Sequence, residues 1–531
     1  MSVGVEDTSS VGALTESGGF GVRWRMGMRW MNSVVAVGMT LLATAVWGET
    51  QVYHLEVGPE TTRVMGPRLA DGTIDYTAAI WEKMSEGVTE ENNAWSLLGP
   101  AIGGWKRFSE GGEGKRFDQL DRQRVEAMKR PWKAEEFPEV ARWLQENDAV
   151  LSAAMKASVR SRLCFPKPVE KDDEILNPPK LGNFREMGGA MVATAMLKAG
   201  GGDQAGARDE LAAAHRLARL LANWPNLLGP LVAIAIDGEG CRAALGGARV
   251  ANEAEAKKWL AMYREMPEIE LNPAALDVDD RYSTLRQVMR VLHGHLDKAL
   301  SEMTMLNVEP MFVEARRNKK FAPGDLDQVD WNVVLRHINA VYNEAVNICG
   351  EKDASKHAEA WAKFAENLKK QRVPGSFMDA LGGSMLEPKK GDLETRTKQM
   401  IQDVEEYLRR HKDETREAYS KRIGAYFTAP VLPIGGSVKL VDRYQCVQRI
   451  YVVGMALEAY QTKNGQYPET LELLKKDYLK ELPKDLFSGK DLVYRREFAG
   501  YLLYSVGPNG VDEGGRKDGE ADDIAVHGAA R

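Results

Sequence analysis

Apolar residues recur at helical spacing through most of the chain. In residues 204–222 the side chains of Leu211 and Leu217 fall on one face of a helix, and residues 184–199 form a similar apolar segment. Three glycines separate these two segments, and Asp203 is a good N-cap for the second. The pattern therefore predicts a hairpin of two long helices.

The same spacing continues on both sides of this hairpin. It predicts further helices over about 226–245, 252–265, 278–306, 330–349, 354–371 and 392–424. Short connections place neighbouring helices antiparallel. A helix–Gly–Asp–helix unit is similar to a tetratricopeptide hairpin, but a clean repeat of about 34 residues is missing. We therefore expect a mainly α protein with an irregular, weakly tetratricopeptide-like antiparallel helical array.

Proline and glycine mark the expected divisions of the chain. Residues 49–180 read as an N-terminal helical region that ends in a proline-rich connection, and residues 181–428 hold the helical array. Residues 429–437, with the sequence APVLPIGGS, read as a linker and are the best candidate for a domain boundary. Residues 438–531 would then form a separate C-terminal domain.

The pattern changes after this linker. One helix is predicted over 438–463, and a short second helix runs from Tyr467-Pro468 to Leu474. Alternating residues then predict strands over Leu492–Arg496 and Tyr501–Val506. The C-terminal domain is therefore expected to be a small α+β unit.

Several short motifs in this unit occur in a defined order. They are Ala459-Tyr460, Gly465, Tyr467-Pro468, Leu482-Pro483-x-Asp485, Tyr501-x-x-Tyr504-Ser505-x-Gly507-x-Asn509-Gly510, Gly514-Gly515 and Asp522-Asp523-Ile524. Together they resemble the globular domain of the G-class major pseudopilins of type II secretion systems, over about 90 residues (438–528). The resemblance implies one spine helix packed on a small antiparallel sheet.

The chain also departs from that family. No prepilin peptidase site precedes the module, and its long helix carries Arg443, Gln445, Gln448 and Arg449, which do not suit a membrane or a pilus core. A polymerising pilin subunit is therefore not expected. Residues 92–95 (NNAW) and the Gly-Asp break at residues 202–203 resemble stretches of uncharacterised exported bacterial proteins that join a helical body to such a tail. This resemblance implies no activity.

The closing loop is acidic. Residues 506–523 contain six carboxylates and two basic residues. Major pseudopilins hold Ca²⁺ in the corresponding loop, and calcium takes carboxylate and carbonyl oxygens. By position, the resemblance implies Asp512 and Asp523 as ligands, with Asp522 and Asn509 as further candidates. The alternative is a solvated acidic turn without metal.

Composition narrows the classes of partner. The chain has 531 residues and a formal net charge of −6, which argues against general nucleic-acid binding. Four cysteines, Cys164, Cys241, Cys349 and Cys446, are too widely spaced for a zinc site. They allow three disulfide pairings, but four buried thiols are the favoured interpretation.

The N-terminus resembles a secretory signal. Arg23, Arg25 and Arg29 precede an apolar run from Val34 to Trp47, and small residues follow. We expect residues 1–48 to be a leader and signal peptide that is cleaved near Gly48, so that the mature protein is periplasmic or envelope-associated. The alternative is an inner-membrane anchor formed by residues 30–47.

Other polar residues have simpler explanations. His293 and His295 point to opposite sides of a predicted helix and cannot chelate one metal ion. His215, near Glu210, is expected to be partly exposed on a helix. Residues 89–93 are interpreted as the cap of a helix with Thr89 at its N-cap. Neither a Walker loop nor a nucleophile elbow or HExxH motif occurs.

Three functions are compatible with these observations. The favoured one is an exported, non-enzymatic envelope protein whose helical body is a scaffold or protein-binding surface and whose partner is another envelope protein. Such a protein would touch the membrane only through an uncleaved signal segment. The second is a component or accessory of a secretion or pilus-like machine. The third is an exported hydrolase of an unrecognised family, which would require carboxylates with raised pKa in a shared cleft.

Overall fold

The computed structural model describes residues 55–70, 72–108, 115–166, 181–292, 329–371, 415–428, 431–432, 434–498, 500–518 and 521–529. The expected leader, His293, His295 and the first part of the helix expected over 392–424 lie outside these residues. Within them the protein is mainly helical, with a small three-stranded antiparallel sheet near the C-terminus. The coarse fold class expected from the sequence is therefore confirmed.

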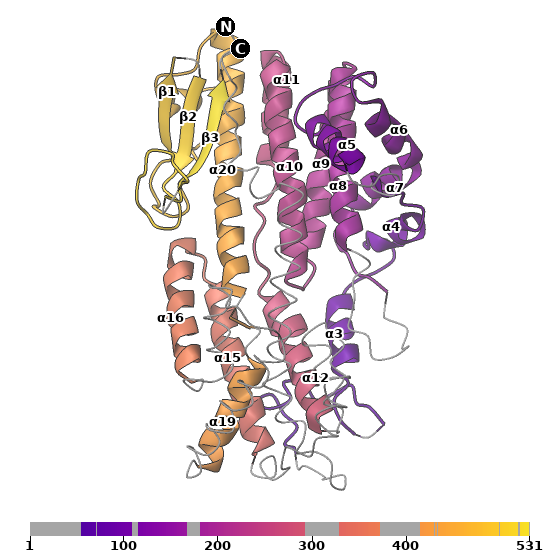
Figure 1. The fold of residues 1–531 in the computed structure, drawn as a ribbon, viewed down its shortest axis with the longest axis vertical. Helices are drawn as coiled ribbons and strands as arrows, with labels where there is room; N and C mark the ends of the chain where they lie inside the picture. The colour runs from indigo at the N-terminus through magenta and orange to yellow at the C-terminus, as the bar shows by residue number, and fades with distance from the viewer. Residues whose placement is uncertain are drawn as a thin grey trace.

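Long helices form a bundle in the upper half of Figure 1. They are α8 (Leu181–Gly200), α9 (Gln204–Ala222), α10 (Leu228–Val250), α11 (Glu253–Arg264) and α20 (Ile434–Asn464). Gly200 ends α8, and a close approach requires glycine there, because a Cβ atom would collide with the backbone of Trp132. Gly202 then turns the chain with a φ of 91°, and Asp203 caps α9 by accepting from Gly206 N at 2.9 Å.

Shorter helices cover the α8–α9 side of this bundle (Figure 1). They are α4 (Trp95–Ile102), α5 (Lys115–Ala127), α6 (Pro138–Glu146) and α7 (Asp148–Ser158). Buried tryptophans hold this layer to α8. The indole of Trp132 donates to the carbonyl oxygen of Ala193 at 3.2 Å, and that of Trp105 donates to Glu186 at 3.1 Å.

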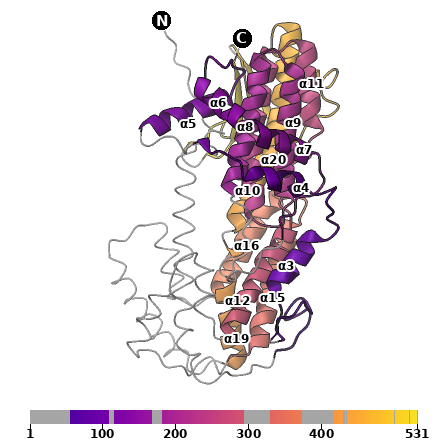
Figure 2. The same cartoon turned by 90° about the vertical axis from the view of Figure 1, so that its right-hand side faces the viewer.

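A second group of helices continues the molecule at the other end (Figures 1 and 2). It contains α3 (Tyr76–Ser85), the π-helix η2 (Ala275–Asp280), α12 (Arg281–Leu292), α15 (Trp331–Cys349), the 3₁₀ turn η4 (Ala354–Lys356), α16 (His357–Lys370) and α19 (Arg416–Phe427). The long helix predicted from residue 278 thus begins as a π-helix.

The sheet lies against one side of α20 (Figure 1). After the 3₁₀ turn η6 (Leu471–Leu474), strands β1 (Val493–Glu497), β2 (Gly500–Ser505) and β3 (Ile524–Ala529) pair antiparallel in that order. In the β2–β3 pairing Tyr501 lies opposite Gly528, which leaves room for the tyrosine ring because a Cβ atom there would overlap it. The sequence predicted β1 and β2 closely but expected only an acidic loop end where β3 forms.

The helix α20 joins the two parts that the sequence separated at the linker. One face of α20 packs on α10 and α11, and another packs on β2 and β3. One contiguous cluster of buried apolar residues includes Ile74 of the N-terminal region, Leu245 of α10, Val441 of α20 and Tyr501 of β2. In the described residues the helical body and the C-terminal unit therefore share one core. Among the residues that the structure describes, no helix combines the length and the apolar character that crossing a membrane requires.

Candidate binding cleft and its buried polar support

A fully buried carboxylate, Asp237 of α10, is the centre of a polar cluster inside the protein. Its Oδ1 lies 2.5 Å from Nδ1 of His215 and accepts from the guanidinium of Arg219, both on α9. Its Oδ2 accepts from the hydroxyl of Tyr444 at 2.7 Å and from Nε2 of Gln448 at 2.9 Å, both on α20. Asp237 therefore links three helices, including one from the C-terminal unit.

The charges in this cluster are matched. Burial alone would raise the pKa of Asp237, but the nearby Arg219 and His215 side chains lower it well below the ordinary value. The pKa of Arg219 is raised in turn by Asp237, against the effect of burial. The carboxylate and guanidinium are thus both ionised in the folded protein, and their hydrogen bonds offset the cost of removing them from water.

A thiol and two phenols extend the cluster. Cys241 lies one turn after Asp237 and contacts the hydroxyl of Tyr263 on α11. The Sγ atom of Cys241 also lies 3.4 Å from the hydroxyl oxygen of Tyr444. Burial raises the pKa of all three groups, so they stay protonated. A neutral, buried thiol is a poor nucleophile, which favours a structural role for Cys241.

The sequence prediction for His215 was wrong. Its side chain is completely buried rather than partly exposed, and its ring packs edge-on against Tyr263 with centroids 4.9 Å apart. The ring fits because residue 240 is glycine, where a Cβ atom would lie 2.6 Å from Cε1 of the imidazole. Nε2 of His215 is buried without a hydrogen-bond partner among the described residues.

A second buried carboxylate, Glu458, connects α20 to the sheet. Its Oε1 lies 3.0 Å from Nε of Arg249 at the end of α10, and its Oε2 accepts from the hydroxyl of Tyr467 at 3.0 Å. The hydroxyl of Tyr501 on β2 is 3.4 Å from Oε1. Asp237 and Glu458 therefore fix α20 between the body and the sheet at two positions along its length.

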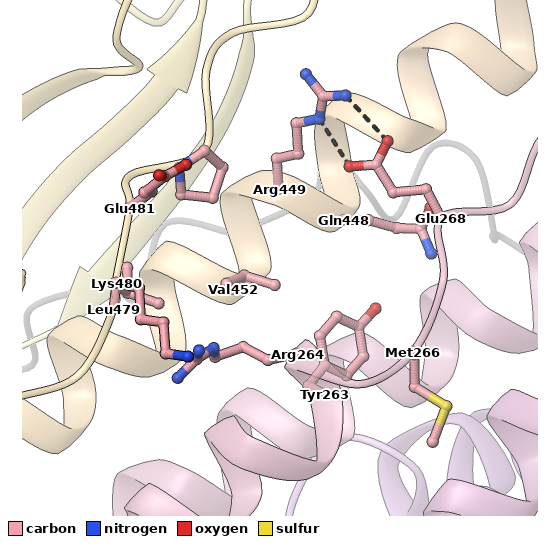
Figure 3. Close-up of a pocket in the computed structure, with 11 residues that line it drawn as sticks. Tyr263, Arg264, Met266, Glu268, Gln448, Arg449, Val452, Leu479, Lys480 and Glu481 are labelled. Carbon is pink, nitrogen blue, oxygen red and sulfur yellow. Dashed lines mark hydrogen bonds and ion pairs between the residues drawn. The ribbon is translucent and has the colours of Figure 1, made fainter.

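Figure 3 shows an open cleft, with a volume of about 510 Å³. The end of α11 and the segment after it form one wall, α20 forms another, and residues 479–483 form the third. Tyr263 and Gln448 belong to both the cleft and the buried cluster. The cluster therefore fixes the position of the cleft's inner surface.

The cleft has a mixed polar and apolar lining. Arg449 forms a two-pronged ion pair with Glu268, with N–O distances of 2.7 and 3.0 Å. Met266, Val452 and Leu479 supply apolar surface. Sites that bind small molecules or peptide segments commonly combine these features, and we take this cleft as the candidate functional site.

The four residues predicted as calcium ligands all lie in the loop between β2 and β3, but they have different partners. Oδ1 of Asp512 accepts from the hydroxyl of Tyr504 at 2.9 Å. Asn509 donates to Glu513 at 2.6 Å, and Asp522 lies 3.6 Å from Arg443. Oδ2 of Asp523 accepts from the backbone N–H groups of Glu513 at 3.1 Å and Gly515 at 2.7 Å, so all four predicted ligands have partners within the protein.

Asp522 and Asp523 nevertheless suit a cation. The Oδ1 atoms of both are buried without a hydrogen-bond partner. Burial raises the pKa of Asp523 to about 6, and the neighbouring Glu513 contributes to this shift. A bound cation would neutralise these carboxylates. Within the described residues, however, no group of three or more acidic, histidine or cysteine side chains is arranged to hold a metal ion.

The polar segment 89–93 does not cap a helix as predicted. The next helix, α4, begins at Trp95, and Thr89 belongs to a turn in which its backbone N–H donates to Asn92 at 2.8 Å. The Asn93 side chain instead bonds the backbone of Cys164, accepting at 2.9 Å and donating at 2.9 Å. The same Oδ1 also accepts from the backbone N–H of Trp95, the first residue of α4, at 3.1 Å, so Asn93 joins the start of α4 to the connection that follows α7.

All four cysteines are buried free thiols, as favoured from the sequence.

The structure also contains a carboxylate pair that the sequence analysis missed. Asp279 and Asp280 end the π-helix η2, and burial, with the charge of Asp280, raises the pKa of Asp279 to about 7. Burial also raises the pKa of Asp280 to about 6, and its Oδ2 accepts from Tyr342 at 2.6 Å.

The cleft and the Asp237 cluster were also missed. Their residues come from five segments of the chain, which are α9, α10, the end of α11 with the segment after it, α20, and residues 479–483, and none of these segments carries a recognisable motif by itself. One signal was present, because Asp237 interrupts an apolar stretch of α10 and so had to find partners inside the protein. The chain matches no protein-family model, no curated protein and no solved structure.

Proposed function

We propose that the protein is an exported, non-enzymatic envelope scaffold that binds a segment of another envelope protein in the cleft beside α20. The observation that carries this proposal is that the helical body and the C-terminal unit build the cleft jointly. The Asp237 and Glu458 clusters hold its walls in place. A preformed cleft lowers the entropy cost of binding.

The proposal includes two statements about the fold. Residues 438–528 form a pseudopilin-like module, and the body is an irregular, weakly tetratricopeptide-like helical array. A long helix with a three-stranded antiparallel sheet on one face is consistent with the resemblance. The opposite face of α20 is occupied by α10 and α11. That packing supports a fixed module rather than a subunit that assembles through its helix, and so favours the scaffold over the secretion-machine alternative. Calcium, held through Asp522 and Asp523, would be a stabilising ion of this module.

The hydrolase alternative has one observation in its favour. Asp279 and Asp280 are adjacent carboxylates with raised pKa, a combination found at many active sites. A screen of the purified protein against glycoside, peptide and ester substrates tests this alternative. Activity that is lost in Asp279→Asn would favour the hydrolase over the scaffold.

Site-specific photo-crosslinking tests the scaffold function. A photoreactive phenylalanine analogue replaces Met266, which lines the cleft, in the full chain expressed in a producing cell. The same replacement at Val159, which is 67% exposed and does not line the cleft, is the control. We expect the protein in the envelope fraction and one defined adduct with an envelope protein at position 266. A cytoplasmic location, or equal adducts at both positions, would contradict the proposal.

A further inference from the structure

Two cations on the rim of the cleft have no acidic partner in the described structure. Arg264 donates from Nη1 to the carbonyl oxygen of Tyr478 at 3.1 Å, and Lys480 lies two residues further along that segment. Figure 3 shows the two charged side chains pointing toward one another. Neither forms an ion pair within the described residues. Arg449, in contrast, is neutralised by Glu268.

This arrangement favours a single anion. Two exposed cations that face one another repel, and an anion between them removes that repulsion. Arginine presents a planar fork that matches both oxygens of a carboxylate, while lysine adds a compact point charge. Arg264 keeps further N–H donors besides the one bonded to Tyr478.

The rest of the cleft indicates what the anion is attached to. Leu479 and Val452 offer apolar surface next to the two cations. Further along, the walls are polar and carry Gln448, the Arg449–Glu268 pair and Glu481. A long alkyl chain would be poorly matched by these walls, whereas the backbone N–H groups of a peptide can donate to the carboxylates of Glu268 and Glu481. Glu481 would repel a second negative charge.

We propose that the cleft binds the C-terminal carboxylate of an extended polypeptide whose last side chain is apolar. The carboxylate lies between Arg264 and Lys480, and the terminal side chain contacts Leu479 and Val452. The preceding residues leave along the polar walls toward Glu481. This inference rests on the proposed function, because it names the part of the partner that the cleft holds.

Calorimetric titration of the purified full chain tests the proposal. The probes are the acetylated tetrapeptide Gly-Ala-Leu-Leu with a free carboxylate and the same peptide with a C-terminal amide. The double variant Arg264→Gln/Lys480→Gln removes both cations. Its matched control, Lys476→Gln/Lys490→Gln, removes two exposed lysines that do not line the cleft.

We expect the acid to bind at least about tenfold more tightly than the amide, since a carboxylate hydrogen-bonded to charged donors commonly contributes that much. The double variant should lose this preference, and the control should keep it. Equal binding of acid and amide, an unchanged preference in the double variant, or no binding of either peptide would overturn the inference. A cross-linked partner at Met266 combined with any of these results would leave the proposed function standing and refute only the carboxylate recognition.

Discussion

The hydroxyl of Tyr444 donates to Oδ2 of Asp237 across 2.7 Å, and so joins the C-terminal helix α20 to α10 inside the core. The two residues are 207 positions apart in the sequence. Because the Asp237 carboxylate also binds Arg219 and His215, a change at this one side chain affects the packing of three helices.

Asp237→Asn should therefore destabilise the fold strongly. The substitution leaves the guanidinium of Arg219 buried without its counter-charge, and the expected loss is about 3–5 kcal/mol of unfolding free energy. Urea denaturation followed by circular dichroism measures it. Asp209→Asn, at an exposed position of α9, is the control and should change stability by no more than about 0.5 kcal/mol. Similar losses in the two variants would contradict the structural role given to Asp237.

Removing the C-terminal unit should make the body insoluble or molten. A chain that ends at residue 428 lacks α20 and exposes the apolar faces of α10 and α11 that it covers. We expect aggregation in size-exclusion chromatography and loss of the near-ultraviolet circular dichroism signal. A monomeric truncated protein with a cooperative thermal transition would show instead that the body is an independent domain.

The pair of His357 on α16 and Asp442 on α20 should make stability fall as the pH rises. Nδ1 of His357 lies 3.0 Å from Oδ1 of Asp442, and this hydrogen bond raises the pKa of the histidine above 6.5. Burial also raises the pKa of Asp442, so both groups hold protons more tightly in the folded state. The histidine contribution is complete below pH 6.5 and is lost as the pH rises through its folded pKa.

The stability of the His357→Gln variant should depend less on pH between pH 6 and pH 8.5. The expected reduction in the change of unfolding free energy is on the order of 1 kcal/mol, and it appears as a smaller difference in melting temperature. His527→Gln, at an exposed position of β3, should leave that difference unchanged. Differential scanning calorimetry at the two pH values measures both effects. An unchanged pH dependence in His357→Gln would show that the pair does not control it.

Removing the charge of Asp279 and removing the charge of Asp277, both in the π-helix η2, should change the stability of the protein in opposite directions. Burial raises the pKa of Asp279 to about 7, so its contribution favours folding at low pH and is lost as the pH rises toward 7. Asp279→Asn removes the cost of ionising a partly buried group and should stabilise the protein at pH 8 by about 1–3 kcal/mol, and less at pH 5.

Asp277→Asn is the matched comparison. Asp277 lies 2.9 Å from Nη2 of Arg281, whose side chain is fully buried, so its loss should destabilise the protein by about 3 kcal/mol. Urea titrations at both pH values compare the two variants. If both substitutions changed the unfolding free energy at pH 8 in the same direction, the different roles given to Asp279 and Asp277 would be contradicted.

Calcium should raise the melting temperature if the acidic loop holds it. Binding to the folded state alone must stabilise that state, and about 1 mM Ca²⁺ in excess over the site should shift the midpoint by about 2–4 °C relative to a chelator. Asp522→Asn should abolish the calcium-dependent shift. Asp518→Asn should keep it, because Asp518 is exposed and paired with Arg516. A shift that persists in Asp522→Asn would place the ion elsewhere.

Local patterns in the sequence predict the helices well because those helices are amphipathic or are bounded by glycine and proline. The bounds of α9 match the prediction, and the chain turns before it where Gly202 adopts a positive φ. The sequence predicted a domain boundary at residues 429–437, but the described residues on both sides of it share one core. The cause is long-range, because α20 begins at Ile434 and its apolar faces are shared between α10 and the sheet.

The functional residues were harder to predict for a related reason. His215 is buried because Asp237 lies at hydrogen-bond distance from its Nδ1 and because Gly240 leaves room for its ring, and both partners are on another helix, α10. The cleft depends on Arg264 and Lys480, which become neighbours through tertiary contacts between α11 and the segment after α20. Neither residue belongs to a motif.

The four buried thiols have a consequence for how such a protein matures. In the native state Cys164, Cys241, Cys349 and Cys446 are all shielded, and burial raises the pKa of Cys446 and of Cys349 to about 12. Mispairing is therefore a hazard of the nascent chain and not of the finished molecule. In an oxidising compartment, the yield of correctly folded protein would be set by a race between core formation and thiol oxidation.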